Sequence, residues 1–259
     1  MKDINILFLG DVVGPRATSY IEDNLKRIIN EEEIDFVCIN GENSAKGNGL
    51  DKAGISRLIA CGADCITTGN HVFKNADTIN FIEDNLRVIR PANFPSSVAG
   101  RGYYIFDMFS FSILVINMLG VVNMEPLDNP FDTVDKILEK EKGNYDFSII
   151  DFHAEATSEK YVFAYYTDGR VGAVLGTHTH VPTADEHILP KGTAFITDVG
   201  MCGPIESSLG VDPECALKKL KYHVPVKFEL SDNPIKANGV IVSLSGETKL
   251  AKSIKRIVF

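Results

Sequence analysis

The chain has 259 residues, of which 44% are hydrophobic and 24% are charged, and this ordinary globular composition predicts a single α/β domain over residues 1–259. Its formal net charge of -9 argues against binding to duplex nucleic acid, because such a surface needs clustered lysine and arginine. No apolar stretch approaches the ~20 residues of a membrane-spanning helix, so we expect a cytoplasmic protein without a membrane partner.

The first third of the chain alternates apolar runs with segments of helical period. INILFLG has the composition of a buried strand, and its apolar run is broken by Asp11 too early for a signal peptide. A predicted helix over residues 15–30 follows, and FVCIN, a helix over residues 51–62 and DCITTG continue the alternation. Asn75 is then expected to cap another helix. This order is typical of parallel strands joined by right-handed crossovers.

The remainder of the chain is richer in strands. FSILVIN, YDFSIIDF and GAVLGT are expected to be fully buried strands, and residues 131–142 to form one further helix. From residue 226, the alternating VIVSL and the closing IKRIVF predict antiparallel strands that cover a sheet edge. The five cysteines form no paired zinc-binding set, so we interpret them as buried reduced thiols. The whole pattern predicts a two-sheet α/β sandwich.

Polar side chains follow directly after the predicted buried strands. They are Asp11, Glu42, Asn43, Asn70, His71, His153, His178 and His180. Because the carboxyl ends of parallel strands share one crevice, we expect these side chains to converge although they are distant in sequence. Carboxylate, amide and imidazole donors without thiolate suit Fe, Mn or Zn better than Ca²⁺ or an iron–sulfur cluster. Glu42 is the carboxylate best placed to bridge two ions.

Each of these motifs also has a purely structural explanation. A Gly-Asp pair after a strand is more often a turn or a helix cap, and GNH alone fits a turn with an exposed histidine. GTHTH is more specific, because His178 and His180, one residue apart on an extended segment, would point the same way towards adjacent ions. Three polar side chains follow His153, namely Glu155, Thr157 and Glu159. They either orient the His153 ring or belong to the solvated start of a helix.

The order of the motifs resembles that of calcineurin-like metallophosphoesterases over residues 11–180. The motifs are Asp11, GEN at residues 41–43, GNH at residues 69–71, His153 and GTHTH. More narrowly, GDVVG, NGEN, TTGNH, DFHAEATSEK and GTHTHVPTAD resemble the YmdB-like branch of that superfamily. The resemblance implies an α/β/β/α sandwich of the metallophosphoesterase type. It also implies a 2′,3′-cyclic-nucleotide 2′-phosphodiesterase, which takes a small-molecule nucleotide and forms a 3′-phosphate.

The chain departs from the wider superfamily at two places. Where that superfamily opens with Asp-x-His, Asp11 is followed by Val12 and Val13, so that one ordinary ligand is missing. Glu42 stands where the wider superfamily has an aspartate, and the YmdB-like resemblance implies that the adjacent Asn43 is recruited as a ligand. It implies one ion on Asp11, Glu42, Asn43 and His180, and the other on Glu42, Asn70, His153 and His178.

The same resemblance leaves His71 free of metal as the general acid. Two transition-metal ions, expected to be Fe or alternatively Mn or Zn, would activate a bridging hydroxide to attack phosphorus, and His71 would protonate the departing 2′ oxygen. Alternation along an extended loop is expected to turn Asn70 and His71 apart. Rival interpretations are a phosphomonoesterase or RNA-processing nuclease with the same site, and a non-catalytic nucleotide-sensing regulator. A homo-oligomer is compatible with the sequence, which does not fix the oligomeric state.

Overall fold

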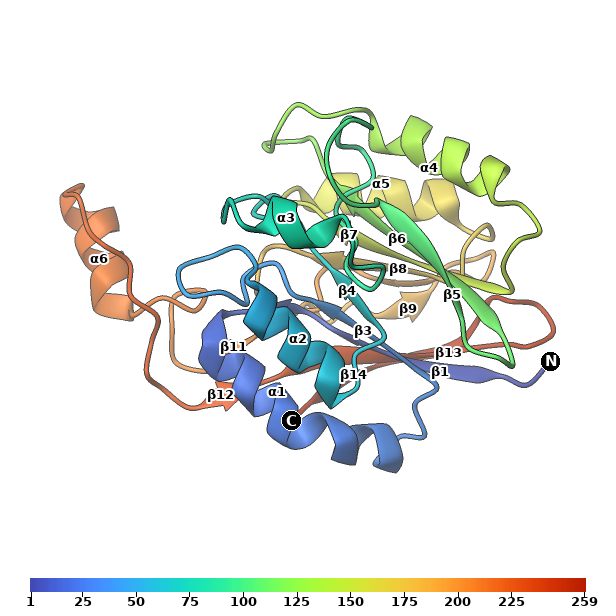
Figure 1. Cartoon of the computed structure of the whole chain (residues 1–259), viewed down its shortest axis with the longest axis horizontal. Helices are drawn as coiled ribbons and strands as arrows, with labels where there is room; N and C mark the ends of the chain where they lie inside the picture. Colours follow the sequence, from blue (N-terminus) through green and yellow to red (C-terminus); the bar gives the residue numbers. More distant parts are fainter.

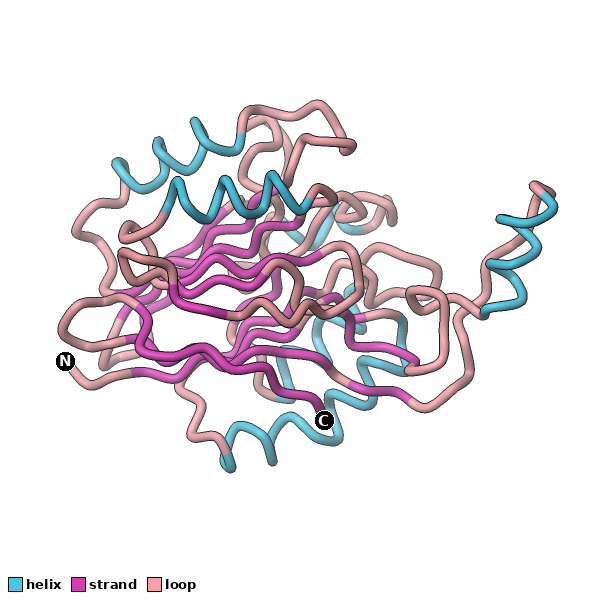
Figure 2. Tube along the Cα trace, turned by 180° about the vertical axis from the view of Figure 1, so that it is seen from behind, coloured by secondary structure: helices cyan, strands magenta, loops and turns pink.

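Two β-sheets packed face to face form the centre of the computed structural model, which describes residues 1–259 (Figures 1 and 2). The five-stranded sheet has the order β14 (Ala251–Val258), β13 (Asn238–Leu244), β1 (Ile4–Leu9), β3 (Phe36–Asn40) and β4 (Cys65–Thr67). Strands β1, β3 and β4 are parallel, as predicted. Strand β13 pairs antiparallel with β1 and with β14, so the last strands of the chain extend this sheet beyond β1, as predicted.

The second sheet has six strands. Its order is β5 (Tyr103–Asp107), β6 (Ser112–Leu119), β7 (Phe147–His153), β8 (Ala173–Thr177), β10 (Ala194–Ile196) and β9 (His187–Ile188). The four central strands are parallel, and β5 and β9 close the two edges in the antiparallel sense. A small third sheet joins β12 (Ile235–Lys236), β11 (Met201–Pro204) and β2 (Asp11–Val12).

Helices cover the outer face of each large sheet. The first sheet carries α1 (Gly14–Glu31), α2 (Lys52–Cys61) and the short α3 (Thr78–Ile82), and the second carries α4 (Pro130–Lys140) and α5 (Thr157–Thr167). Figure 1 shows the two helical layers on opposite sides of the paired sheets. The predicted two-sheet α/β/β/α sandwich is confirmed.

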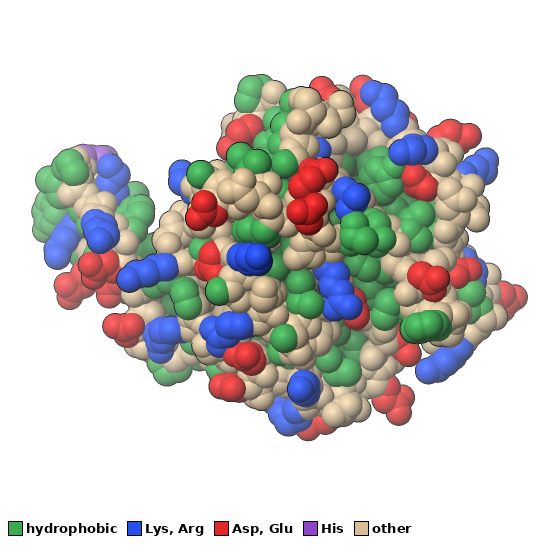
Figure 3. Space-filling view, viewed as in Figure 1, with side chains coloured by type: hydrophobic (Ala, Val, Ile, Leu, Met, Phe, Trp, Pro, Cys, Tyr) green, Lys and Arg blue, Asp and Glu red, His purple; other side chains and the backbone are tan.

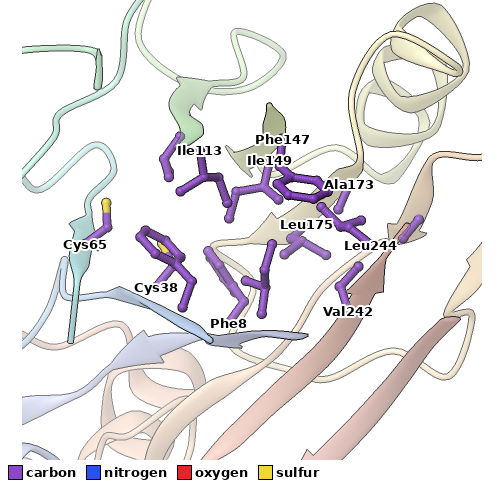
Figure 4. Close-up of a cluster of buried hydrophobic side chains, with 14 of the residues drawn as sticks. Phe8, Cys38, Cys65, Ile113, Phe147, Ile149, Ala173, Leu175, Val242 and Leu244 are labelled. Carbon is purple, nitrogen blue, oxygen red and sulfur yellow. The ribbon is translucent and has the colours of Figure 1, made fainter. Parts of the chain in front are cut away.

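The core lies in three layers because each central strand is buried on both faces. On β1, Ile6 and Phe8 point into the space between the sheets, where they meet Phe147 and Leu175 from the second sheet (Figure 4). The alternate residue Leu7 packs under α1 and α2 instead. Burial on both faces explains why these strands are continuous apolar runs rather than alternating ones.

The helix boundaries follow local capping chemistry where the sequence has a clear cap. The Asp51 carboxylate accepts the amide of Gly54 at 2.7 Å, and Gly62 ends α2 with a φ of 128°, as predicted. The prediction that Asn75 caps the next helix was wrong. Helix α3 begins only at Thr78, because the amide group of Asn75 instead donates to the carbonyl of Leu50 and stabilises a turn.

One helix was not predicted and stands apart from the body. None of the residues of α6 (Pro213–Tyr222) is buried, and hydrophobic and basic side chains are both visible on this projecting arm (Figure 3). Leu217 and Leu220 are 54% and 73% exposed. Cys215 on α6 is partly exposed, so the prediction of buried thiols is confirmed only for the other four cysteines. No helix of the chain has the length and apolar character needed to cross a membrane.

Candidate metal centre and active site

The strand ends bring together all eight polar residues that the sequence singled out. Asp11 lies on β2 just after β1, Glu42 and Asn43 follow β3, Asn70 and His71 follow β4, His153 ends β7, and His178 and His180 follow β8. Both large sheets therefore contribute to one cluster. The oxygen donors and His71 come from β2 and from the loops after β3 and β4, and the other histidines come from the ends of β7 and β8.

Glu42 and His153 form the centre of the cluster. The Glu42 carboxylate lies 3.2 Å from His153 Nε2, and that nitrogen is 3.0 Å from Nδ1 of His178. The amide oxygen of Asn70 is 3.2 Å from the same His153 nitrogen. One candidate ligand atom from each of Glu42, His153 and His178 lies within 4.8 Å of the others. Candidate ligand atoms of four side chains thus lie close enough together to bind one metal ion.

Asp11 and Asn43 both lie near His180. Asp11 Oδ1 is 3.8 Å from His153 Nδ1 and 3.8 Å from His180 Nε2. The Asn43 amide nitrogen is 3.5 Å from His180 Nε2. Asn43 forms an isolated parallel bridge with Val13, so its backbone lies beside the residue that occupies the place of the missing histidine. The side chain of Asn43 is therefore close enough to Asp11 and His180 to complete a second group of donors.

The donors fit metal cations on evidence from the side chains themselves. Asp11 and Glu42 have 0% and 1% exposed side chains, and neither carboxylate pairs with a lysine or arginine. Oδ1 of Asp11 is buried without any hydrogen-bond partner. Buried carboxylate oxygens without partners are costly, whereas a bound cation would satisfy them. The mixture of carboxylate, amide and imidazole donors suits transition-metal ions.

The pKa values of the cluster reflect both its burial and the charges of its own side chains. Burial raises the pKa of Asp11, and burial followed by repulsion from His153 lowers the pKa of His178 to about 4. Burial alone would lower the pKa of His153, but the carboxylates of Glu42, Asp11 and Asp151 outweigh it and raise that pKa to about 9. Without a cation from outside, histidine is the only source of positive charge beside these carboxylates.

A buried polar layer beneath His153 fixes its ring. Thr177 Oγ1 donates its proton to Asp151 at 2.7 Å, so the same oxygen accepts from His153 Nδ1 at 2.9 Å. The Asn40 amide donates to the other Asp151 oxygen at 2.9 Å. This arrangement leaves His153 Nε2 directed at Glu42, as metal-binding histidines require. Sequence reasoning missed Asn40, Asp151 and Thr177, although polar residues within apolar strands were a usable signal.

The expectation that GTHTH is an extended segment was wrong. His178 and His180 have φ values of 102° and 66°, in the left-handed region that costs a non-glycine residue about 1–3 kcal/mol. Between them, Thr179 donates from its amide and hydroxyl groups to Asp198 at 3.0 and 2.8 Å. Asp198 is fully buried and paired with the buried Lys160 at 2.8 Å. This ion pair holds the loop in the conformation that turns both histidines into the cluster.

Neither explanation of the residues after His153 was wholly correct. Glu155 contacts Nε2 of His178 at 3.1 Å rather than His153. Glu159 is buried and accepts the backbone amides of Val121 and Val122 at 2.9 and 3.3 Å. Only the prediction of a helix start was confirmed, since α5 begins at Thr157.

His71 has the most exposed imidazole of the cluster, with 28% of its side chain accessible. Its Nδ1 lies 2.9 Å from the Asn43 amide oxygen and 3.1 Å from Glu42. The segment is a turn, with the Val72 amide bonded to the Gly69 carbonyl at 3.3 Å, so the predicted extended loop was wrong. The side chains of Asn70 and His71 nevertheless diverge, Asn70 towards His153 and His71 towards Asn43.

Comparison with known proteins identifies the family to which the chain belongs. A family model described as "YmdB-like protein" matches residues 7–257 of the chain. The chain belongs to the YmdB-like family. It is 42% identical over 255 residues to a Bacillus subtilis (strain 168) member named 2′,3′-cyclic-nucleotide 2′-phosphodiesterase, with 98% of this chain and 97% of the relative covered.

Two solved structures share the fold of this YmdB-like chain over almost its entire length. A Thermus thermophilus structure described as a hypothetical protein is 36% identical, with a TM-score of 0.93 and 99% of each chain covered. A Mycoplasma pneumoniae structure described as a novel phosphatase is 35% identical, with a TM-score of 0.94, and covers 100% of this chain and 94% of its own.

Proposed function

We propose that this YmdB-like protein hydrolyses 2′,3′-cyclic nucleotides to 3′-phosphates at a centre of two transition-metal ions. The observation that carries the proposal is the pair of buried carboxylates, one with an oxygen that lacks any partner, among amide and imidazole donors. The name of the Bacillus subtilis relative supports the choice of substrate.

The residues fall into two groups that would each hold one ion. We assign Asp11, Asn43 and His180 to one ion because His180 is near both other residues, and Asn70, His153 and His178 to the second because His153 contacts the other two. We assign Glu42 to both ions because its carboxylate lies 3.2 Å from Nε2 of His153 and 3.1 Å from Nδ1 of His71, a nitrogen that also contacts Asn43. When bound, the ions would supply Lewis-acid activation of the phosphate ester and of a water molecule.

His71 is assigned as the proton donor to the departing 2′ oxygen. Its ring is the most exposed of the cluster, and Nε2 makes no hydrogen bond within the chain, so this nitrogen is free for the substrate. Its Nδ1 contacts the Asn43 oxygen and the Glu42 carboxylate, which fix the ring in position. A placed imidazole matters because a ribose alkoxide is a poor leaving group.

The proposed reaction is tested by its product. The purified protein should convert 2′,3′-cyclic nucleotides to 3′-phosphates, because cleavage at the 2′ oxygen leaves the phosphate on the 3′ oxygen. Chromatography against authentic 2′- and 3′-phosphates measures the outcome. Exclusive formation of 2′-phosphates would contradict the proposal. Activity confined to monoesters would favour the phosphomonoesterase instead, an activity compatible with the description of the Mycoplasma pneumoniae structure.

Metal content gives an independent check on the centre. We expect freshly purified protein to carry about two transition-metal ions per chain, Fe first and Mn or Zn as alternatives, because nitrogen and oxygen donors of this kind favour such ions. Elemental analysis by plasma mass spectrometry provides the measurement. Protein that contains only Ca or Mg, or that stays metal-free after incubation with each candidate ion, would contradict the assignment.

Asn43→Ala is expected to lower metal content towards one ion per chain and to reduce turnover with it. Val13 offers no donor atom beside Asp11, so the Asn43 oxygen is the remaining candidate on that side. Asn43→Asp is the matched variant, since it keeps an oxygen at the same place and should retain both ions. If Asn43→Ala kept the metal content and the turnover of the wild type, the ion beside Asp11 would be completed by another group.

A further inference from the structure

One surface hollow borders the metal ligands directly. It has a volume of about 360 Å³ and is lined by Asn70, Asn123, Met124, Glu125 and His178. Asn70 and His178 form its inner wall, and residues 123–125, between β6 and α4, form its outer rim. A substrate whose phosphate lies at the cluster therefore has room on this side for the group attached to the phosphate.

The lining suits an uncharged group rather than a second phosphate. It contains no lysine or arginine, and the carboxylate of Glu125 would repel another anion. The side chains of Asn123 and Glu125 make no hydrogen bond within the chain, so their donors and acceptors are free for a ligand. Met124 adds a polarisable thioether that packs well against an aromatic ring. A nucleoside fits this lining, because it has hydroxyl and amino groups for Asn123 and Glu125 and a flat ring for Met124.

The segment that leads into the rim is held in place by hydrogen bonds within the protein. The buried Glu159 carboxylate accepts the amides of Val121 and Val122, and the Gly120 amide donates to the carbonyl of His153 at 3.0 Å. Residues 120–122, which lead directly into the rim, are thus bonded to the backbone of His153 and to a side chain of α5. Recognition by a preformed rim costs less ordering entropy than recognition by a free loop.

We propose that this hollow binds the nucleoside of the cyclic ester, with Met124 against the base and with Asn123 and Glu125 bonded to its hydroxyl or amino groups. The inference rests on the proposed function, because it takes the phosphate to lie at the metal cluster. The preference for a nucleotide over a simple cyclic phosphate would then depend on rim residues that are not metal ligands.

The test compares two cyclic esters on the metal-loaded protein. The first is adenosine 2′,3′-cyclic phosphate, and the second is ethylene glycol cyclic phosphate, which has the same five-membered ester without a nucleoside. Asn123→Gly and Glu125→Gln should each raise KM for the nucleotide by about 3- to 10-fold, the loss expected for one hydrogen bond, with kcat nearly unchanged. Glycine suits position 123 because its φ is 60°. Both variants should treat the simple ester as the wild type does.

Glu139→Gln on the exposed face of α4 is the matched control, and it should leave both KM values unchanged. An unchanged KM for the nucleotide in both rim variants would overturn the inference, and so would an equal loss on the two esters. If the wild type hydrolysed neither ester, the proposed function would fail. Calorimetric titration with adenosine 3′-phosphate would then test separately whether the hollow binds a nucleoside. Weaker binding by Asn123→Gly would then support it, and equal binding would overturn it.

Discussion

His71→Ala is expected to slow hydrolysis of 2′,3′-cyclic nucleotides by about 10²–10⁴-fold, the usual contribution of a placed general acid. The variant should keep both metal ions, since the remaining seven donors are untouched. Esters of nitrophenol should be affected much less, because the nitrophenolate anion leaves without a proton. Steady-state rates with both ester types, measured at a known metal content, provide the comparison.

His223→Asn is the matched control for this substitution. His223 is exposed at the end of α6 with a φ of 54°, which asparagine tolerates well, so its rates should equal those of the wild type. A His71→Ala protein that lost metal would instead identify His71 as a ligand. Equal slowing of both ester types would identify it as a positioning group, and another residue would have to be the acid.

The position of the site residues at the ends of the strands could be predicted from the sequence, because it depends on local chemistry. Buried parallel strands need continuous apolar runs, and the residues after them must lie at one edge of the sheet. This reasoning placed Asp11 after β1, Glu42 after β3 and His153 at the end of β7 without knowledge of any contact. Helices with strong caps, such as α2 after Asp51, were predictable for the same local reason.

The conformation of the GTHTH loop could not be predicted from the sequence, because residues distant in the chain impose it. An extended path would be the default for His178 and His180, yet both adopt positive φ values. The cause is Asp198, which binds Thr179 and is neutralised by Lys160, 38 residues away in sequence. Removing one partner of a buried ion pair typically costs about 3–5 kcal/mol, which is comparable with the strain of two residues at about 1–3 kcal/mol each.

The start of α5 connects several parts of the site that sequence reasoning treated separately. Glu155 contacts Nε2 of His178, and Glu159 accepts the amide of Val121 just before the rim. Lys160 neutralises Asp198, which holds the GTHTH loop. These three side chains come from less than two turns of one chain segment. The DFHAEATSEK motif therefore supplies the candidate metal ligand His153 and then the side chains that support its neighbours.

Gly69→Ala is expected to remove bound metal and to lower activity by about 10²-fold or more, because misplacing catalytic groups by ~1 Å already has such an effect. Gly69 lies between β4 and Asn70, and a Cβ built on it would overlap the Glu42 carboxylate and the His153 ring. Its backbone φ is not positive, so alanine strains no dihedral angle there. The loss would come only from displacement of two central donors.

Gly54→Ala is the matched control, because Gly54 is also buried but lies in α2, where a Cβ would make ordinary contact at 3.4 Å with the Asp51 carboxylate. Alanine in a helix interior should stabilise the fold slightly and leave metal content unchanged. Metal analysis, turnover and thermal unfolding of both variants separate the effects. A folded Gly69→Ala protein with two ions and normal turnover would show that the metal centre does not lie between Glu42 and His153. Loss of metal with an intact fold would instead place the centre at the carboxylate and the imidazole that the new methyl group displaces.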